Sequence, residues 1–419
     1  MKKHHIPLLV IAVFTLLQLV VLAVFGYTPY PDSNGYWNIA RECMEQGAPY
    51  PTANHLKELP FIWNIGAINA VYASLWLFGS TYPLLVLYSL LKGATAWLVY
   101  KVAERMFNTQ TAYIALGVYV LYLANYGEST SFNSDLPFTF FSMLAVWLML
   151  CRKRFVAGGI VLALANWVRP VAMVFLVSMI VYALLQRKRD WPRVGKMVAG
   201  FALMVCLIGS GCYLRTGHFL YQATTGWEIL MQYHWEQDTD KQADRRLFAC
   251  GDPTAVPDST FDYRQRDSLS RVNFFKWLSH NKGEYARQIP YKIVKTYVSD
   301  NPNMCAFMDK EQKASSYMYS PISMEVLKKD FPHYSGVQWL TVCNLLFYYV
   351  LMLLALSGAW KAASNRTLWL LVLIPLLGTL FIALVGHGEA RYHQPFMPFL
   401  IMLAAWRIKT WRDTILSGK

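Results

Sequence analysis

Charged residues are scarce in this sequence: they make up 15% of its 419 residues, whereas 55% are hydrophobic. A soluble domain of this length could not cover so much apolar surface with so few charges. Several apolar stretches approach the roughly 20 residues that a membrane-spanning helix needs, which indicates repeated crossings of a bilayer. The composition therefore excludes an ordinary soluble protein and predicts an all-α polytopic membrane protein.

Motifs for structural metal, redox chemistry and nucleotide binding are also lacking. The seven cysteines contain no Cys-x-x-Cys pair, which argues against structural zinc and a dithiol redox site. Cys250 and Cys305 share one long polar segment, and their spacing leaves open whether they form a disulfide. No Rossmann-like unit for a nucleotide sugar is recognisable, and the chain has no internal repeat or low-complexity stretch.

Positive charge is in excess, at +14, which could indicate a nucleic-acid partner. The basic residues, however, form short clusters between apolar runs, as the topology of a membrane protein requires. We therefore interpret the charge as a signal for orientation, and expect membrane lipids and no nucleic acid as partners.

Ten apolar runs are suitable for spanning a membrane. The run 6–27 is too long for the core of a signal peptide and lacks a clear cleavage site, so we expect an uncleaved first span. The segment 61–79 contains Asn, Gly and Tyr residues that suit a lipid-facing helix poorly, and we expect it to form an interfacial or re-entrant helix. The ten runs are 6–27, 82–101, 111–127, 137–151, 155–169, 170–187, 196–215, 338–360, 367–386 and 394–409.

The positive-inside rule orients these runs. If the N-terminus is inside and 61–79 does not cross, eighteen Lys and Arg residues fall in the cytoplasmic segments and four in the short outer ones. Both termini are then cytoplasmic. Two long regions, 28–81 and 216–337, face the periplasm of a bacterial inner membrane.

These boundaries divide the chain into three parts. Residues 1–215 form an N-terminal transmembrane module that includes the outer loop 28–81. Residues 216–337 form a periplasmic loop or small domain, in which 271–298 has the apolar spacing of a helix along the membrane surface. Residues 338–419 form the C-terminal transmembrane helices.

Many ionisable residues fall on the predicted outer side, often at the ends of apolar runs. Charges in such positions are costly unless they meet one another or a water-filled cavity. Their shared side therefore predicts one polar site. These residues are Asp32, Glu42, Lys57, Glu58, Glu128, Asp135, Arg169, His387, Glu389, Arg391 and His393.

Three acidic residues are candidates for this site. Asp32, in Asp-Ser-Asn-Gly directly after the first span, suits a turn or helix N-cap and equally a carboxylate base at the membrane surface. Asp135, in Ser-Asp-Leu-Pro between two spans, suits an N-cap or a second carboxylate of the same cavity. Glu128 begins the same loop.

Three basic residues are notable as well. Arg169 lies at the tip of a tight apolar hairpin, where it suits either snorkelling to the interface or holding a phosphate. Arg391 lies in a short loop crowded with glycines, prolines and charges, which favours a functional role. Lys92 lies inside the run 82–101 and should face protein or water, in a structural ion pair or a functional one.

Two aromatic residues and four candidate metal ligands have sequence positions that fit more than one role. Tyr36 and Tyr392 lie near these charges and suit either stacking on a sugar or the aromatic belt of the membrane interface. A divalent metal is left open, because the spacing of the available ligands is not diagnostic. These ligands are Glu42, His55, Glu58 and His387.

The order of several short motifs resembles that of a known family, the multispanning GT-C glycosyltransferases. The branch concerned contains bacterial aminoarabinose transferase, the protein O-mannosyltransferases and the lipopolysaccharide galacturonosyltransferases. The resemblance covers most of 1–200 and 380–409, whereas 216–337 is outside it. The motifs are an Asp just after the first span, Lys57-Glu-Leu-Pro before an apolar run, Asp135-Leu-Pro in an outer loop, a basic residue before Pro170, and Arg391-Tyr-x-x-Pro-x-x-Pro.

The resemblance implies a GT-C fold, a sugar donor carried on polyprenyl phosphate, and inverting transfer on the periplasmic side to a glycan, lipid or protein acceptor. Asp32 then corresponds to the catalytic Asp of the first loop and Asp135 to a second carboxylate. Arg169 takes the place of a basic residue that holds the donor phosphate. The candidates for binding the donor phosphate or sugar are Arg169, Arg391, Tyr36, Lys57, Glu128 and Tyr392.

Two other functions compete with this one. A transporter or flippase of lipid-linked saccharides needs polar residues through the depth of the membrane, whereas here they gather on one side. A polymerase or ligase of lipid-linked saccharides differs mainly in its acceptor. The sequence leaves the donor sugar, the acceptor and the oligomeric state open.

Overall fold

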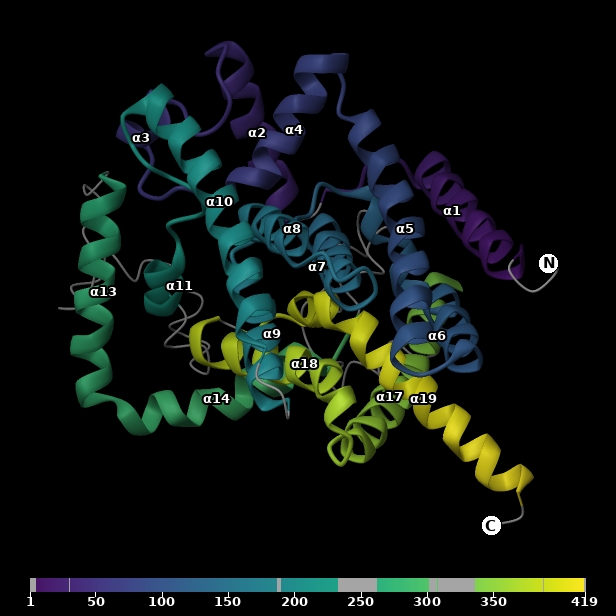
Figure 1. The fold of residues 1–419 in the computed structure, drawn as a ribbon. Coiled ribbons are helices and arrows are strands. Elements are labelled where there is room, and N and C mark those ends of the chain that lie inside the picture. Colours follow the sequence, from purple (N-terminus) through teal and green to yellow (C-terminus); the bar gives the residue numbers. More distant parts are fainter. Residues whose placement is uncertain are drawn as a thin grey trace, which may run out of the picture.

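The structure is a computed structural model of the chain. It describes residues 5–29, 31–186, 190–232, 262–300, 307, 336–386 and 388–417. In these ranges every regular element is an α-helix or a 3-10 helix, and the helices pack into a bundle (Figure 1). The predicted all-α fold is therefore confirmed.

Each of the ten predicted runs coincides with a helix. Among the described residues, α1, α5, α10, α17 and α18 are long and apolar enough to cross a membrane. The helix α7 follows 3-10 turns at a bend of 114°, and this pair could form a sixth crossing. The multi-pass assignment is thus confirmed, while the number ten stays a prediction. The helices are α1 His5–Phe25, α5 Tyr82–Met106, α6 Thr109–Leu121, α7 Asp135–Leu150, α8 Phe155–Val168, α9 Met173–Leu185, α10 Trp191–Thr216, α17 Gly336–Ala362, α18 Trp369–Val385 and α19 Met397–Leu416.

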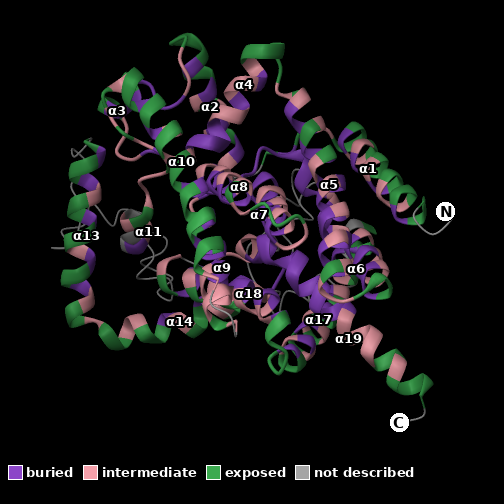
Figure 2. Ribbon diagram, viewed as in Figure 1, coloured by how far each residue is buried: buried purple, intermediate pink, exposed green. Residues whose placement is uncertain are grey.

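The burial pattern is that of a helical membrane protein. Large apolar side chains such as Leu9, Leu16 and Val24 of α1 are exposed, as a lipid-facing surface requires. The buried residues lie in the middle of the bundle, around α5, α7 and the start of α19 (Figure 2). Polar residues are buried there too, and they include the candidate site.

Small residues allow α8 and α10 to pack closely. A Cβ atom on Gly159 of α8 would lie 2.0 Å from the backbone oxygen of Met197, and one on Gly200 of α10 would lie 2.2 Å from that of Val156. Glycine at both positions therefore lets the two backbones approach, as is common between membrane helices. This contact holds the first turns of α8 against α10, at the end of α8 opposite to Arg169.

The first predicted outer loop is largely helical. It contains α2 Pro31–Glu45, α3 Ala53–Glu58 and α4 Ile65–Phe78. The helix α4 packs against α2, α5 and α8 and ends at Gly79, whose φ of +63° favours glycine. With 14 residues it is as short as α6, α8 and α9, and its interfacial or re-entrant placement stays a prediction.

The region 216–337 contributes α11 Gly226–Gln232, α13 Tyr263–His280 and α14 Lys282–Tyr297. The expected helix over 271–298 is in fact two helices, between which the chain turns sharply (Figure 1). The break is at Asn281, whose φ of −120° and ψ of 32° are not helical and whose backbone and side-chain nitrogens both donate to the backbone oxygen of Trp277. The helix α14 packs on α18 and on the 3-10 helix η8 Ala390–Phe396.

Five cysteines are free thiols in the described residues: Cys43, Cys151, Cys206, Cys212 and Cys343. The remaining two, Cys250 and Cys305, lie outside the described residues, so the disulfide stays open. The division into three parts also stays a prediction.

Candidate active site

Asp32 lies in the first turn of α2, directly after α1. Pro31 begins this helix, where its missing N–H costs nothing. A carboxylate in the first turn is stabilised by the positive end of the helix dipole. The segment Asp-Ser-Asn-Gly is therefore the start of a helix and not a free turn.

Arg391 joins Asp32 to the C-terminal part of the chain. Its NH1 lies 2.6 Å from Oδ2 of Asp32, and its Nε lies 2.6 Å from Oε2 of Glu389. The side chain of Arg391 is 11% exposed and that of Asp32 is 27% exposed. The carboxylate of Asp32 is thus both oriented by a guanidinium and partly open, which suits a group that contacts a substrate.

Arg169 and Asp135 form a second ion pair. NH1 of Arg169 lies 2.6 Å from Oδ1 of Asp135 and donates to Oγ of Ser134 at 3.1 Å. Asp135 begins α7, and Arg169 ends α8 in extended backbone, as a residue before proline prefers. Both side chains are almost buried, so the site is deeper here than at Asp32.

The ring of Tyr392 contacts the arginine of each pair. Its centroid is 4.8 Å from the guanidinium carbon of Arg169 and 5.5 Å from that of Arg391. Both distances permit cation–π attraction. Burial, and secondarily the charge of Glu389, raise the pKa of the Tyr392 hydroxyl well above its ordinary value. The ring of Tyr392 thus joins the Asp32–Arg391 pair to the Asp135–Arg169 pair in one cluster.

Tyr36 supports this site from α2. It is buried, accepts a hydrogen bond from Nδ2 of Asn64 at 2.7 Å, and meets the ring of Trp63 edge-on. Burial, and then the charge of Asp32, raise the pKa of its hydroxyl. These contacts join α2 to the start of α4, and a sugar-binding role of Tyr36 stays a prediction.

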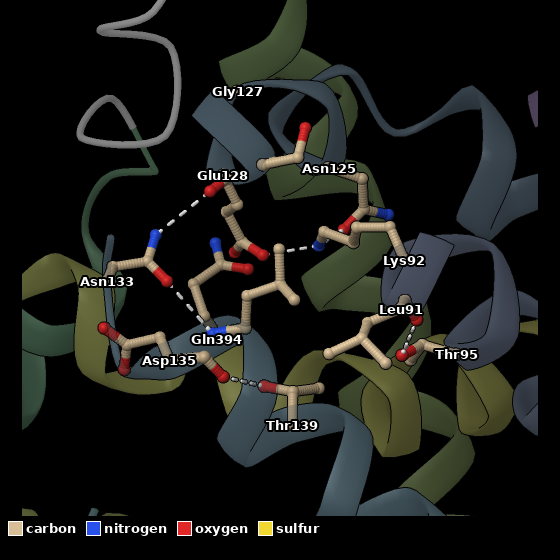
Figure 3. A network of polar contacts seen from close by, with 12 residues as sticks. Leu91, Lys92, Thr95, Asn125, Gly127, Glu128, Asn133, Asp135, Thr139 and Gln394 are labelled. Atoms are coloured by element: carbon tan, nitrogen blue, oxygen red, sulfur yellow. Dashed lines mark hydrogen bonds and ion pairs between the residues drawn. The ribbon is translucent and has the colours of Figure 1, made fainter. Parts of the chain in front are cut away.

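Glu128 is buried and pairs with Lys92. Oε2 of Glu128 lies 2.5 Å from Nζ of Lys92, which also donates to Oδ1 of Asn125 at 2.9 Å (Figure 3). The lysine in the apolar run thus faces protein. Nδ2 of Asn133 bonds to the backbone oxygen of Glu128, which ties this pair to the loop ahead of Asp135.

Lys57 is the predicted site residue that lies apart. It is exposed on α3, and no contact in the described residues joins it to the Asp32 cluster. Among the predicted metal ligands, Nε2 of His55 lies 3.2 Å from Oε2 of Glu42, and His387 lies outside the described residues. In the described ranges no three His, Cys, Asp or Glu side chains could hold a metal ion, and metal dependence stays open.

Asp300 is a buried polar residue that the sequence did not reveal. It follows α14, and its carboxylate accepts hydrogen bonds from Tyr122 and Gln394. In sequence it looks like an ordinary polar residue in a long loop. Only its place directly after an amphipathic helix could have drawn attention to it.

Comparisons with known proteins bear on this architecture. Residues 65–210 match the model of the dolichyl-phosphate-mannose-protein mannosyltransferase family. This match includes Asp135 and Arg169 but neither Asp32 nor Arg391. Comparison with curated proteins finds no relative.

Solved structures give a likeness over nearly the whole chain. One is the archaeal oligosaccharyltransferase AglB from Archaeoglobus fulgidus in complex with an inhibitory peptide and a dolichol-phosphate, at 12% identity and a TM-score of 0.52, over 99% of this chain and 52% of that one. The apo form of the Archaeoglobus fulgidus oligosaccharyltransferase gives 12% identity and a TM-score of 0.51, over 99% and 51%. The chain has a GT-C fold.

The resemblance to GT-C membrane glycosyltransferases, predicted from the order of the motifs, is therefore confirmed. The chain spans about half the length of the oligosaccharyltransferase structures that it matches. In this chain, η8, which carries Arg391, packs against α7, which begins at Asp135.

Proposed function

We propose that this protein is a GT-C glycosyltransferase that transfers a hexose or pentose from polyprenyl phosphate to a glycan, lipid or protein of the cell envelope. The observation that carries the proposal is the meeting of two carboxylate–guanidinium pairs, Asp32–Arg391 and Asp135–Arg169, on the ring of Tyr392. Glycosyl transfer from a lipid phosphate needs both kinds of group in one place.

Asp32 is the base of the proposed reaction. An acceptor hydroxyl is a poor nucleophile, and a carboxylate that takes its proton during attack accelerates the reaction. The acceptor oxygen forms a bond to the anomeric carbon while the bond from that carbon to the phosphate oxygen breaks. A single displacement of this kind inverts the anomeric configuration. The partial exposure of Asp32 leaves room for the acceptor.

Arg169 is the proposed partner of the leaving phosphate. Charge develops on the phosphate oxygen as the bond breaks, and fixed guanidinium groups stabilise it. In the described residues, Asp135 and Ser134 both contact NH1 of Arg169, which leaves its other donors for a phosphate. Asp135 thus orients the arginine, and Arg391 contacts the same ring of Tyr392 as Arg169 does.

The proposed location is the periplasmic face of a bacterial inner membrane, with both termini cytoplasmic. The distribution of Lys and Arg along the sequence supports this orientation. The ionisable pair inside the predicted span 82–101, Lys92–Glu128, is buried and satisfied by protein partners, which disfavours a polar path for transport.

The test is the release of polyprenyl phosphate from a panel of polyprenyl-phosphate sugars by purified full-length protein with mixed envelope acceptors. Wild type and Asp32→Asn are compared, with Glu45→Gln on the exposed side of α2 as the matched control. Release by wild type and Glu45→Gln but not by Asp32→Asn supports the proposal and names the donor. Release from no donor by folded wild type contradicts it and favours a transporter or a pyrophosphate-linked donor.

A further inference from the structure

Asp300 is a fully buried carboxylate that takes no part in the proposed transfer step. The hydroxyl of Tyr122 donates to its Oδ2 and the amide of Gln394 donates to its Oδ1. Nε2 of His393 lies 3.5 Å from the same Oδ1. A buried carboxylate is costly unless hydrogen bonds satisfy it, so the donors of Tyr122 and Gln394 stabilise Asp300 and are held in place by it.

Two of these partners belong to the segment that carries the site. His393 and Gln394 directly follow Arg391 and Tyr392 in η8. Tyr122 comes from the end of α6, on another side of the bundle. The bond from Gln394 to Asp300 therefore anchors η8 three residues after Arg391, whose guanidinium contacts Asp32.

The helix that ends just before Asp300 fixes the rest of this segment. Nζ of Lys292 in α14 donates to the backbone oxygen of Gly386 at 2.9 Å, at the negative end of α18. Gly388, with a φ of +64°, lies so close to α14 that a Cβ there would be 2.8 Å from the backbone oxygen of Lys292. Nδ1 of His393 donates to the backbone oxygen of Thr296 at 2.7 Å. The helix α14 thus contacts the segment between α18 and α19 at Gly386, Gly388 and His393.

We propose that Asp300 is a positioning residue that keeps Arg391 and Tyr392 in place against Asp32 and Arg169. This inference rests on the proposed function. The hydroxyl of Tyr122 and the amide of Gln394 meet on one carboxylate, so loss of the Gln394 bond removes one of the contacts that hold η8 against α14 and α6. A displacement of about 1 Å in a positioning contact can cost two orders of magnitude in rate. Through Asp300 and α14, the region outside the GT-C motifs takes part in shaping the site.

The test exchanges the carboxylate and the amide across one hydrogen bond. Asp300→Asn places two amides face to face. It replaces one carboxylate oxygen by an NH2 group, so either Tyr122 or Gln394 loses its acceptor. Gln394→Glu places two carboxylates face to face. The double variant Asp300→Asn/Gln394→Glu restores one carboxylate and one amide, with Tyr122 still able to donate to the Asn oxygen. Asp413→Asn, at the exposed end of α19, is the matched control for a lost carboxylate.

The readout is the affinity of the full-length protein in detergent for farnesyl phosphate, used as a short polyprenyl phosphate, together with KM and kcat for the donor identified above. We expect each single variant to weaken binding and raise KM by about 10-fold or more, and the double variant to return to within about threefold of wild type. Thermal unfolding separates lost stability from lost affinity. If Asp300→Asn alone does not accumulate, the double variant and Tyr122→Phe carry the test.

The outcomes distinguish this inference from the proposed function. If wild type does not bind farnesyl phosphate, the proposed function fails and the inference loses its basis. If wild type binds and Asp300→Asn binds equally well, the positioning role is wrong. Weak binding by folded Asp300→Asn without rescue in the double variant contradicts positioning through Gln394.

Discussion

Arg391 contacts Asp32 at 2.6 Å although 359 residues separate them in the chain. Asp32 belongs to the helix after the first span, and Arg391 to the turn before the last helix. The candidate site is therefore complete only when the two ends of the bundle have packed together. Arg169 and Asp135 from the middle of the chain join them through Tyr392.

Arg169→Ala should weaken use of the donor and destabilise the protein. Removal of the guanidinium leaves Asp135 buried without its charged partner, which costs about 3–5 kcal/mol when a buried pair is broken. Arg169→Lys keeps the charge but loses the planar fork and the stacking on Tyr392, so it should recover stability more than activity. Thermal unfolding and KM for the donor check this. Equal recovery of both would argue that only the charge matters.

Lys92→Met should destabilise the bundle, whereas Lys92→Met/Glu128→Gln should recover much of the loss. The single change leaves Glu128 buried beside a methionine, at a cost of about 3–5 kcal/mol, and the second change removes that charge. The measurement is thermal unfolding alongside donor release. If the stable double variant keeps its activity, Glu128 has a structural role and does not bind the donor.

Lys57→Ala should lower donor release much less than Arg169→Ala does. Lys57 is exposed on α3, and the described contacts do not connect it to the two ion pairs. Initial rates over a range of donor concentrations compare the two variants. A rise in KM for Lys57→Ala as large as that for Arg169→Ala would show that α3 moves toward the site when the donor binds.

Tyr392→Phe should retain most activity, whereas Tyr392→Leu should lose it. The contact with Arg169 and Arg391 is made by the face of the ring, which phenylalanine keeps and leucine lacks. Because burial raises the pKa of the hydroxyl, Tyr392 stays neutral up to and above its ordinary pKa near 10, and its ionisation should not limit the alkaline side of the pH profile. A rate that falls for wild type but not for Tyr392→Phe below pH 10 would contradict this.

The sequence predicts the helices and the residues of the candidate site better than it predicts which of these residues form ion pairs. Apolar runs depend on local composition alone, and each of the ten coincides with a helix. Asp32, Asp135, Arg169 and Arg391 could be placed on one side because the rule for orientation assigns sides from charge. Which carboxylate meets which guanidinium depends on how the helices pack, and no local pattern encodes that.

Other features depend on contacts that are even more remote in sequence. Asp300 looks like a solvated loop residue, and only the packing of α14 against η8 buries it. The position of Lys92 inside an apolar run predicts that it has a partner. The sequence does not show which of the acidic residues on the predicted outer side this is, and the structure pairs it with Glu128. The break at Asn281 is not evident in the sequence because apolar spacing continues through it, whereas the backbone of Asn281 leaves the helical conformation.

The most direct test of the site is the structure of Asp32→Asn, in lipid nanodiscs, with a bound polyprenyl phosphate. The account predicts that a phosphate oxygen lies within about 3 Å of a guanidinium nitrogen of Arg169, beside the ring of Tyr392 and facing residue 32. A phosphate bound instead at Lys57 on α3, or away from both ion pairs, would contradict the assignment of this cluster as the active site.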